Sequence, residues 1–202
     1  IILYTAKPVI FGSIAAKLAN IESINSLITG LGHYFISRSF YSLLIKKILI
    51  NLYRISLNFN NNVIFQNNDD KKYFIKLKIF KSGYRNIFTV SGSGVNTEYF
   101  YPLPYPKNTS FILVARLLKE KGVIEYINAC KYISKKYKDI YFYLGGWIDN
   151  HPNSIKIKDL NKINSIKNFT YLGKITDMRK AISNASIFVL PSYREGLPKV
   201  VM

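Results

Sequence analysis

The segment Phe111-Ile112-Leu113-Val114-Ala115-Arg116 joins five apolar residues to a cation, and Lys121-Gly122 follows five residues after Arg116. An apolar run of this length that ends in a polar loop is typical of a buried strand. Ligands of open α/β sheets bind beyond the carboxyl ends of the strands, where Arg116 and Lys121 would lie. A guanidinium and an ammonium there suit a diphosphate, although two cations in a solvated surface loop would give the same pattern.

Short apolar strands alternate with amphipathic helices on both sides of this segment, which predicts an α/β fold with parallel sheets. The expected strands are residues 1–4, 24–28, 63–66, 87–90, 111–115, 141–144, 169–172 and 187–190. The expected helices are residues 8–19, 40–55, 71–82 (capped by Asn68, Asp69 or Asp70), 123–137 and 177–185 (capped by Thr176).

A proline-rich stretch interrupts this alternation. Pro102, Pro104 and Pro106 lie within residues 99–108, where fixed φ angles and missing N–H groups prevent regular secondary structure. We therefore expect one α/β domain in residues 1–101, a linker at 102–108 and a second α/β domain in residues 109–202.

The composition is that of a folded and strongly basic protein. The chain has 202 residues, of which 49% are hydrophobic, enough to form a buried core. Its one cysteine, Cys130, excludes an internal disulfide and suits a reducing compartment. The net charge of +18 favours nucleic acid, phosphorylated ligands or an anionic membrane surface as partners, unless the lysines only solvate exposed faces. The sequence has no run of about 18 apolar residues, so it predicts no membrane-spanning helix.

A second loop also follows an expected strand and precedes an expected helix. It is Leu190-Pro191-Ser192-Tyr193-Arg194-Glu195-Gly196-Leu197-Pro198. Pro198 fits the first position of a helix, which would leave the N–H groups of Lys199 and Val200 free to bind an anion. Gly196 allows the backbone to approach a ligand closely, and Glu195 could accept hydrogen bonds from sugar hydroxyls. A tight turn with an exposed glutamate is the alternative.

Together the two loops resemble the donor domain of the family 4 glycosyltransferases of the GT-B fold, the glycosyl transferases group 1. These enzymes carry an Arg with a Lys-Gly five residues later, and a Pro-Ser-x-x-Glu-Gly-x-Pro loop. The resemblance implies that Arg116 and Lys121 bind the donor diphosphate, and that Glu195 holds the donor sugar with the backbone near Gly196 and Leu197. These three charged side chains are thus the expected catalytic residues. The second glutamate of the family's motif would fall one position after Met202.

The first half of the chain resembles the acceptor domain of one branch of this family, which adds sugars to polyprenyl-diphosphate-linked saccharides in capsule, O-antigen or glycan assembly. The segments that carry this resemblance are Thr5-Ala6-Lys7-Pro8, Phe11-Gly12-Ser13, Ala15-Ala16-Lys17, Thr29-Gly30-Leu31-Gly32, Phe65-Gln66-Asn67 with Asp69, and Gly94-Val95-Asn96 with Phe100. The resemblance therefore covers nearly the whole chain, as an acceptor-side and a donor-side Rossmann-like domain, each incomplete and cut at the chain ends.

The resemblance implies a retaining, metal-independent hexosyltransferase that moves a hexose or N-acetylhexosamine from a UDP-sugar to a lipid-linked saccharide. It implies no cofactor beyond the nucleotide-sugar co-substrate, and a cytoplasmic location, with possible peripheral attachment at the inner face of the membrane. The alternatives are a UDP-sugar epimerase of the same fold, and an inactive truncated remnant or basic binding module. The sequence contains no recognisable nucleic-acid module and no metal-ligand pattern.

Two features outside these motifs are ambiguous. The helix expected at 40–55 places Phe40, Leu44, Ile48, Leu52 and Ile55 at helical spacing beside Lys46, Lys47 and Arg54. Such a helix packs on its own sheet, which we favour, or lies on an anionic membrane surface. His33 follows the Gly30–Gly32 turn, where a structural or solvated histidine is expected rather than a catalytic one.

Overall fold

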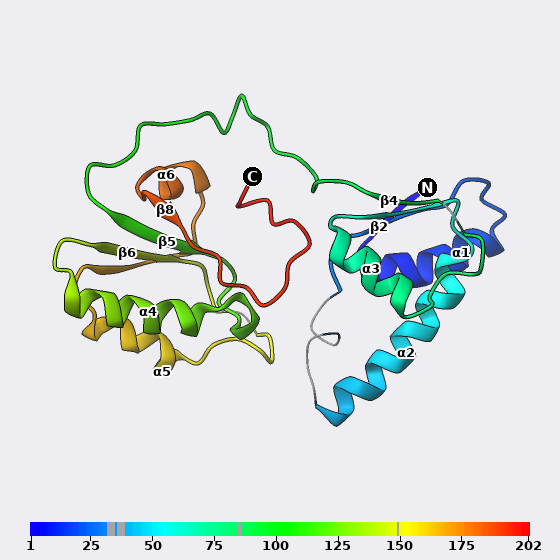
Figure 1. The fold of residues 1–202 in the computed structure, drawn as a ribbon, viewed down its shortest axis with the longest axis horizontal. Helices are drawn as coiled ribbons and strands as arrows, with labels where there is room; N and C mark the ends of the chain where they lie inside the picture. The colour runs from blue at the N-terminus through cyan, green and yellow to red at the C-terminus, as the bar shows by residue number, and fades with distance from the viewer. Residues whose placement is uncertain (32–34, 36–38, 85, 149) are drawn as a thin grey trace. The chain divides into compact units, whose positions relative to one another are not determined.

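The computed structural model describes residues 1–31, 35, 39–84, 86–148 and 150–202. The chain forms two compact units (Figure 1). The first unit contains residues 1–95 together with 195–202, and the second contains residues 96–194. Residues 195–202 thus pack with the first unit, although the sequence places them in the donor-side domain; the domain boundaries of the complete protein stay a prediction.

The first unit is built on a four-stranded parallel sheet with strand order β1-β2-β3-β4. The strands are β1 (Ile2–Tyr4), β2 (Asn25–Ile28), β3 (Asn62–Phe65) and β4 (Ile87–Thr89), and the helical segments are a π-helical turn (Pro8–Gly12), α1 (Ser13–Leu18), α2 (Phe40–Leu57) and α3 (Asn68–Lys76). Because the strands follow one another in one direction, right-handed crossovers place the helices on the same face of the sheet (Figure 1).

Aromatic side chains fill the space between this sheet and its helices. The ring of Phe74 on α3 lies 5.1 Å from the rings of both Tyr53 on α2 and Phe65 on β3, centroid to centroid. All three residues are fully buried. Edge-to-face rings of this kind add to the free energy gained from burial, so α2, α3 and the sheet are joined by one cluster.

The second unit holds a parallel sheet of a different order, β7-β6-β5-β8. Its strands are β5 (Ser110–Val114), β6 (Tyr141–Gly145), β7 (Phe169–Gly173) and β8 (Ile187–Phe188). Its helical segments are a 3-10 turn (Lys119–Lys121), α4 (Val123–Lys136), α5 (Ile157–Leu160), a second 3-10 turn (Asn161–Ser165) and α6 (Met178–Ser183). The chain runs outward from β5 to β7 and then returns to β8 on the other side of β5. Accordingly, α4 and α5 lie on one face of the sheet and α6 on the other (Figure 1).

The expected α/β fold and all eight expected strands are confirmed, with ends shifted by one or two residues. Two helix caps were predicted wrongly. Helix α3 begins at Asn68 and is capped by Asn67, and α6 is capped by Asp177 rather than by Thr176. In both cases the capping residue has an extended backbone and its side chain accepts a hydrogen bond from an N–H of the first turn.

The helix expected to begin at Pro198 is absent. Residues 199–201 form a turn, in which the N–H of Val201 donates to the carbonyl oxygen of Pro198 at 3.0 Å. The N–H groups of Lys199 and Val200 therefore do not form a helix terminus.

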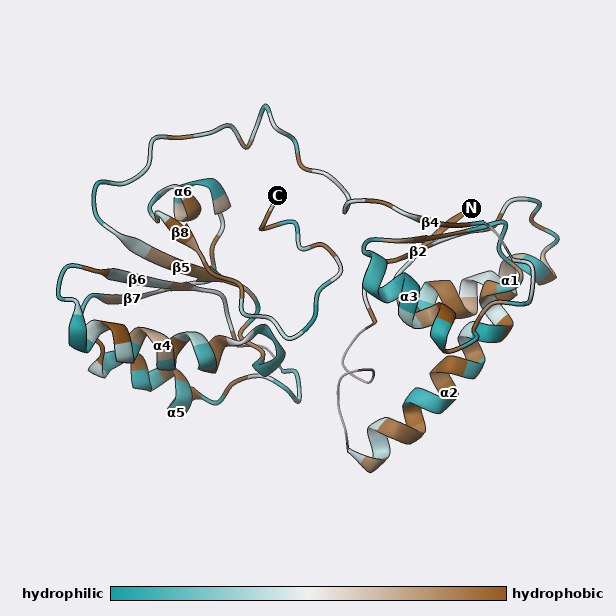
Figure 2. Ribbon diagram, viewed as in Figure 1, coloured by the Kyte–Doolittle hydropathy of each residue, from teal (hydrophilic) through white to brown (hydrophobic). Residues whose placement is uncertain are grey.

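Helix α2 packs on the core of the first unit, as favoured, but of the five apolar residues expected to make this contact only Leu52 does so. Phe40, Leu44, Ile48 and Ile55 are exposed by 78%, 53%, 52% and 53%. The buried residues of the helix are Ser42, Tyr53, Ser56 and Leu57. These four residues therefore form an apolar face that is exposed. Figure 2 shows that apolar residues occur along the length of α2.

Candidate functional site

The two loops that the sequence analysis singled out begin at neighbouring strands. Strand β5 pairs with β8 in parallel, so the loop that begins at Ala115 and the loop that begins after Phe188 leave the same edge of the sheet. The strand order reverses at this pair, with β6 and β7 on one side of β5 and β8 on the other. Such a reversal is the point at which open α/β sheets bind ligands, beyond the carboxyl ends of the strands.

Direct contacts join the two loops. The backbone N–H of Tyr193 donates to the carbonyl oxygen of Glu120 at 3.0 Å. The Tyr193 hydroxyl donates to Oε1 of Glu125, on the first turn of α4, at 2.6 Å. This hydrogen bond to the carboxylate raises the pKa of Tyr193 above its ordinary value. The two contacts hold the second loop against the start of α4.

Two glycines allow backbone segments at this edge of the sheet to approach each other closely. Gly122 has a left-handed φ of +70° at the junction of the 3-10 turn and α4, and a Cβ atom there would lie 2.2 Å from the carbonyl oxygen of Pro191. Gly146, at the end of β6, fits in the same way, because its Cβ would lie 2.0 Å from the carbonyl oxygen of Ala115. The backbone is therefore close-packed at this edge of the sheet.

The candidate cations lie in the first of these loops. Arg116, two residues past the end of β5, is exposed, and Lys121, on the 3-10 turn, is half-buried. Ser192 in the second loop has a buried hydroxyl oxygen that no described residue hydrogen-bonds. A buried hydroxyl without a protein partner is the exception in folded proteins, and a ligand can supply the missing bond.

The remaining candidate residues lie in the first unit. The backbone carbonyls of Glu195 and Gly196 accept hydrogen bonds from the side-chain amide of Asn67, at 3.2 and 3.1 Å. A Cβ atom on Gly92 would lie 2.6 Å from Cδ2 of Leu197. Asn67 and Gly92 follow β3 and β4, so the carboxyl ends of this second sheet hold the segment. Asn67 belongs to the Phe65-Gln66-Asn67 motif, but the sequence carries no signal for this contact.

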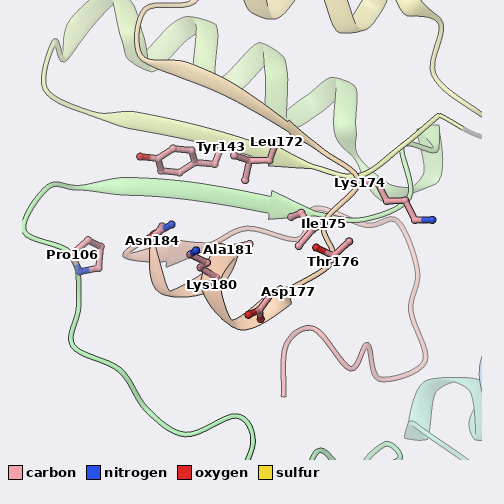
Figure 3. Close-up of a pocket in the computed structure, with 10 residues that line it drawn as sticks. All are labelled: Pro106, Tyr143, Leu172, Lys174, Ile175, Thr176, Asp177, Lys180, Ala181 and Asn184. Carbon is pink, nitrogen blue, oxygen red and sulfur yellow. The ribbon is translucent and has the colours of Figure 1, made fainter.

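A cavity of about 470 Å³ occupies another part of the second unit (Figure 3). It runs between the sheet and α6, from Pro106 to Lys174, and is bordered by Tyr143, Leu172 and Lys180. None of the candidate residues lines it. The candidate residues of the second unit therefore lie at the carboxyl edge of its sheet and not in this cavity.

Three further expectations concern His33, a membrane-spanning helix and a metal site. His33 and Gly32 lie outside the described residues. Within the part of the chain that the structure describes, no helix is long and apolar enough to span a bilayer. Across the same residues, no three His, Cys, Asp or Glu side chains are grouped so as to hold a metal ion.

Comparison with known families decides the classification. The family model "Glycosyl transferases group 1" matches residues 97–202, which is just over half of the chain and includes both loops. The chain belongs to this family. The resemblance drawn from Arg116, Lys121 and the Pro191–Pro198 loop is thereby confirmed.

Two curated glycosyltransferases match nearly the whole chain. One is the N,N'-diacetylbacillosaminyl-diphospho-undecaprenol alpha-1,3-N-acetylgalactosaminyltransferase of Campylobacter jejuni, 29% identical over 95% of this chain and 52% of the relative. The other is the UDP-Gal:alpha-D-GlcNAc-diphosphoundecaprenol alpha-1,3-galactosyltransferase of Escherichia coli, 26% identical over 98% of this chain and 53% of the relative. The chain spans about half the length of these relatives.

Solved structures of other proteins share the fold. The Alr3699/HepE protein of Anabaena, in complex with UDP-glucose, superposes with a TM-score of 0.70 over 96% of this chain and 54% of that protein, at 17% identity. At this identity the likeness concerns the fold alone. The expected GT-B class, with parallel Rossmann-like sheets, is confirmed.

Proposed function

We propose that the complete protein is a retaining glycosyltransferase that moves a hexose or N-acetylhexosamine from a UDP-sugar to a polyprenyl-diphosphate-linked saccharide. The observation that carries this proposal is the contact between the Arg116–Gly122 and Pro191–Arg194 loops at the strand reversal of the second unit. Both curated relatives are named for diphospho-undecaprenol-linked acceptors, and one is named for a UDP-galactose donor. Retention of configuration follows from membership of the family.

In this proposal, Arg116 and Lys121 stabilise the leaving diphosphate. The bond between the anomeric carbon and the diphosphate oxygen breaks as the acceptor hydroxyl oxygen bonds to that carbon, and the hydroxyl proton passes to the leaving diphosphate. Negative charge grows on the diphosphate as its bond to the sugar breaks. A guanidinium can bind phosphate oxygens bidentately, and an ammonium adds a point charge; both are worth most when they stabilise charge that develops in the transition state. With these two cations the reaction needs no metal or other cofactor. Glu195, with the backbone of Gly196 and Leu197, binds hydroxyls of the donor sugar.

The test is a transfer assay on the complete protein. Radiolabelled UDP-GlcNAc, UDP-GalNAc, UDP-glucose and UDP-galactose are each incubated with short-chain polyprenyl-diphosphate-linked saccharides. Label in the lipid-linked product, with the donor's anomeric configuration by NMR, is the expected result. Interconversion of UDP-sugars without an acceptor would instead support the epimerase alternative. If the protein neither binds nor converts either substrate, the result would support the inactive or binding-module alternative.

We also propose that the first unit associates with the cytoplasmic, anionic surface of the membrane that holds such an acceptor. The exposed face of α2 carries the apolar side chains of Phe40, Leu44, Ile48 and Ile55, with the exposed cation Lys47 at its margin. The first unit as a whole has thirteen Lys and Arg and four Asp and Glu, a formal net charge of +9. Apolar side chains beside cations are the pattern of helices that lie in a bilayer interface.

Co-sedimentation with vesicles tests this association on the complete protein. We expect binding to vesicles of phosphatidylglycerol and phosphatidylcholine that weakens as salt is added, because the cations act through screened electrostatics. The double variant Leu44→Glu/Ile48→Glu should lose most of the binding. Tyr132→Glu, which adds one charge at an exposed position on α4 of the other unit, is the control. Equal binding by both variants and the wild type would contradict the assignment of α2.

A further inference from the structure

Asn67 occupies the junction between β3 and α3, and its side chain makes contacts in two directions. Its backbone is extended, with φ −151° and ψ 158°, and its Oδ1 accepts a hydrogen bond from the N–H of Asp70 at 2.7 Å. This bond caps α3. The cap uses only the acceptor half of the amide and leaves the two N–H groups of Nδ2 for other partners.

The donor half of the same amide reaches the far end of the chain. Nδ2 lies 3.2 Å from the carbonyl oxygen of Glu195 and 3.1 Å from that of Gly196, and 3.3 Å from Oδ2 of Asp70. A single planar group therefore orients two consecutive peptide units that are 128 and 129 residues away in sequence. No carboxylate or hydroxyl of similar size supplies two donors in one plane.

The surroundings of Gly196 leave no room for a side chain. A Cβ atom there would lie 2.1 Å from the carbonyl oxygen of Thr29 and 2.8 Å from Oε1 of Gln66. Gln66 is itself held by a hydrogen bond from its Nε2 to Oγ of Ser93, at 3.0 Å. The segments after β2, β3 and β4 thus surround the peptide of residues 195–196, and Asn67 is the hydrogen-bond donor among them.

We propose that Asn67 is a positioning residue for sugar transfer, which fixes the backbone of Glu195 and Gly196 in the orientation that receives the donor sugar. The proposal rests on the function proposed above for these two residues. Asn67 acts through them, because its amide contacts their carbonyl oxygens and the cap of α3. Its loss should therefore weaken recognition of the sugar and leave recognition of the nucleotide diphosphate intact.

Asn67→Asp in the complete protein separates the two contacts of this side chain. The carboxylate keeps an oxygen that can cap α3, but it cannot donate to the two carbonyl oxygens. We expect at least a tenfold loss in kcat/KM with the UDP-sugar and weaker binding of the UDP-sugar by calorimetry. Binding of UDP alone should stay within about twofold of the wild type, because UDP has no sugar to place. A merely structural defect would lower both affinities together.

Two further variants complete the design. Asn67→Ser also keeps a capping oxygen and removes the amide, so it should behave like Asn67→Asp without adding a charge. Asp177→Ala removes the cap of α6, which carries none of the candidate residues, and should keep the ratio of UDP-sugar to UDP affinity. Wild-type kcat/KM and an unchanged affinity ratio in Asn67→Asp and Asn67→Ser would overturn the proposal.

Hydrogen exchange gives a readout that does not depend on activity. The amides of residues 195–197 should exchange at least tenfold faster in Asn67→Asp than in the wild type, while those of α3 keep their protection. Equal exchange of residues 195–197 in both proteins would contradict the role of Asn67 in holding this segment. If the wild type transfers no sugar but the exchange difference appears, the proposed function fails and the role of Asn67 in holding this segment stands.

Discussion

Gly122 lies so close to Pro191 that a Cβ atom on the glycine would be 2.2 Å from the proline carbonyl oxygen. The two residues are far apart in sequence, and their approach holds the second loop over the start of α4. We expect Gly122→Ala to lower the free energy of unfolding of the second unit by about 3 kcal/mol, since it combines a left-handed φ with an overlap against backbone. Urea unfolding measures this loss.

Gly173 is the matched control for that prediction. It also has a left-handed φ, +65°, but nothing lies within 4 Å of the position where a Cβ would be. Gly173→Ala should therefore cost only the strain of the left-handed conformation, about 1 kcal/mol. Equal losses in the two variants would show that the contact between Gly122 and Pro191 does not constrain the loops.

The aromatic cluster of the first unit should dominate its stability. Phe74→Ala removes a fully buried ring from between Tyr53 and Phe65, and we expect a loss of about 3–5 kcal/mol in the free energy of unfolding. Phe88→Ala truncates a half-exposed ring on β4 and should cost about 1 kcal/mol or less. Similar losses from both variants, in the same urea titration, would contradict the placement of the core.

The thiol of Cys130 should be nearly inert while the protein is folded. It is 2% exposed on α4, and burial raises its pKa to about 12. Because only the thiolate reacts, alkylation of Cys130 by iodoacetamide at pH 8 should be at least tenfold slower than in urea, as followed by mass spectrometry. Rapid labelling of the folded protein would place Cys130 at the surface.

The same shift has a consequence for stability. The pKa of Cys130 is higher in the folded than in the unfolded state, so the folded state binds more protons above pH 9. The contribution of this group is therefore complete below about pH 9 and falls as the pH rises toward 12. Cys130→Ala should reduce the loss of stability between pH 9 and 11, measured by urea unfolding. An unchanged pH dependence in this variant would contradict the shift.

Features that depend on local sequence could be predicted well. The apolar runs at 111–115 and 141–144 form adjacent parallel strands, and the pairing of β5 with β8 brings together the two loops that the motifs identified. The strand–loop–helix pattern of these segments was enough to predict that the two loops lie together, because the carboxyl ends of parallel strands share one edge of the sheet. The short α5 was missed because four residues carry too little periodicity to be recognised.

Features that depend on distant residues could not be predicted. The spacing of Phe40, Leu44 and Ile48 predicts an apolar face, but only the position of Tyr53 in the core shows that the opposite side of α2 is buried. In the same way, the contact of Asn67 with Glu195 joins residues 128 apart. Periodicity identifies a face, and the tertiary fold decides what it touches.

The most direct test of the central claim is the transfer rate of Arg116→Ala and Lys121→Ala in the complete protein, with UDP-sugar and a polyprenyl-diphosphate-linked saccharide. Each should reduce turnover roughly tenfold or more, because a charge directed at the leaving diphosphate is lost. Lys119→Ala removes an exposed cation from the same loop and should stay within about twofold of the wild type. Wild-type turnover in Arg116→Ala or in Lys121→Ala would contradict the assignment of this loop to the donor diphosphate.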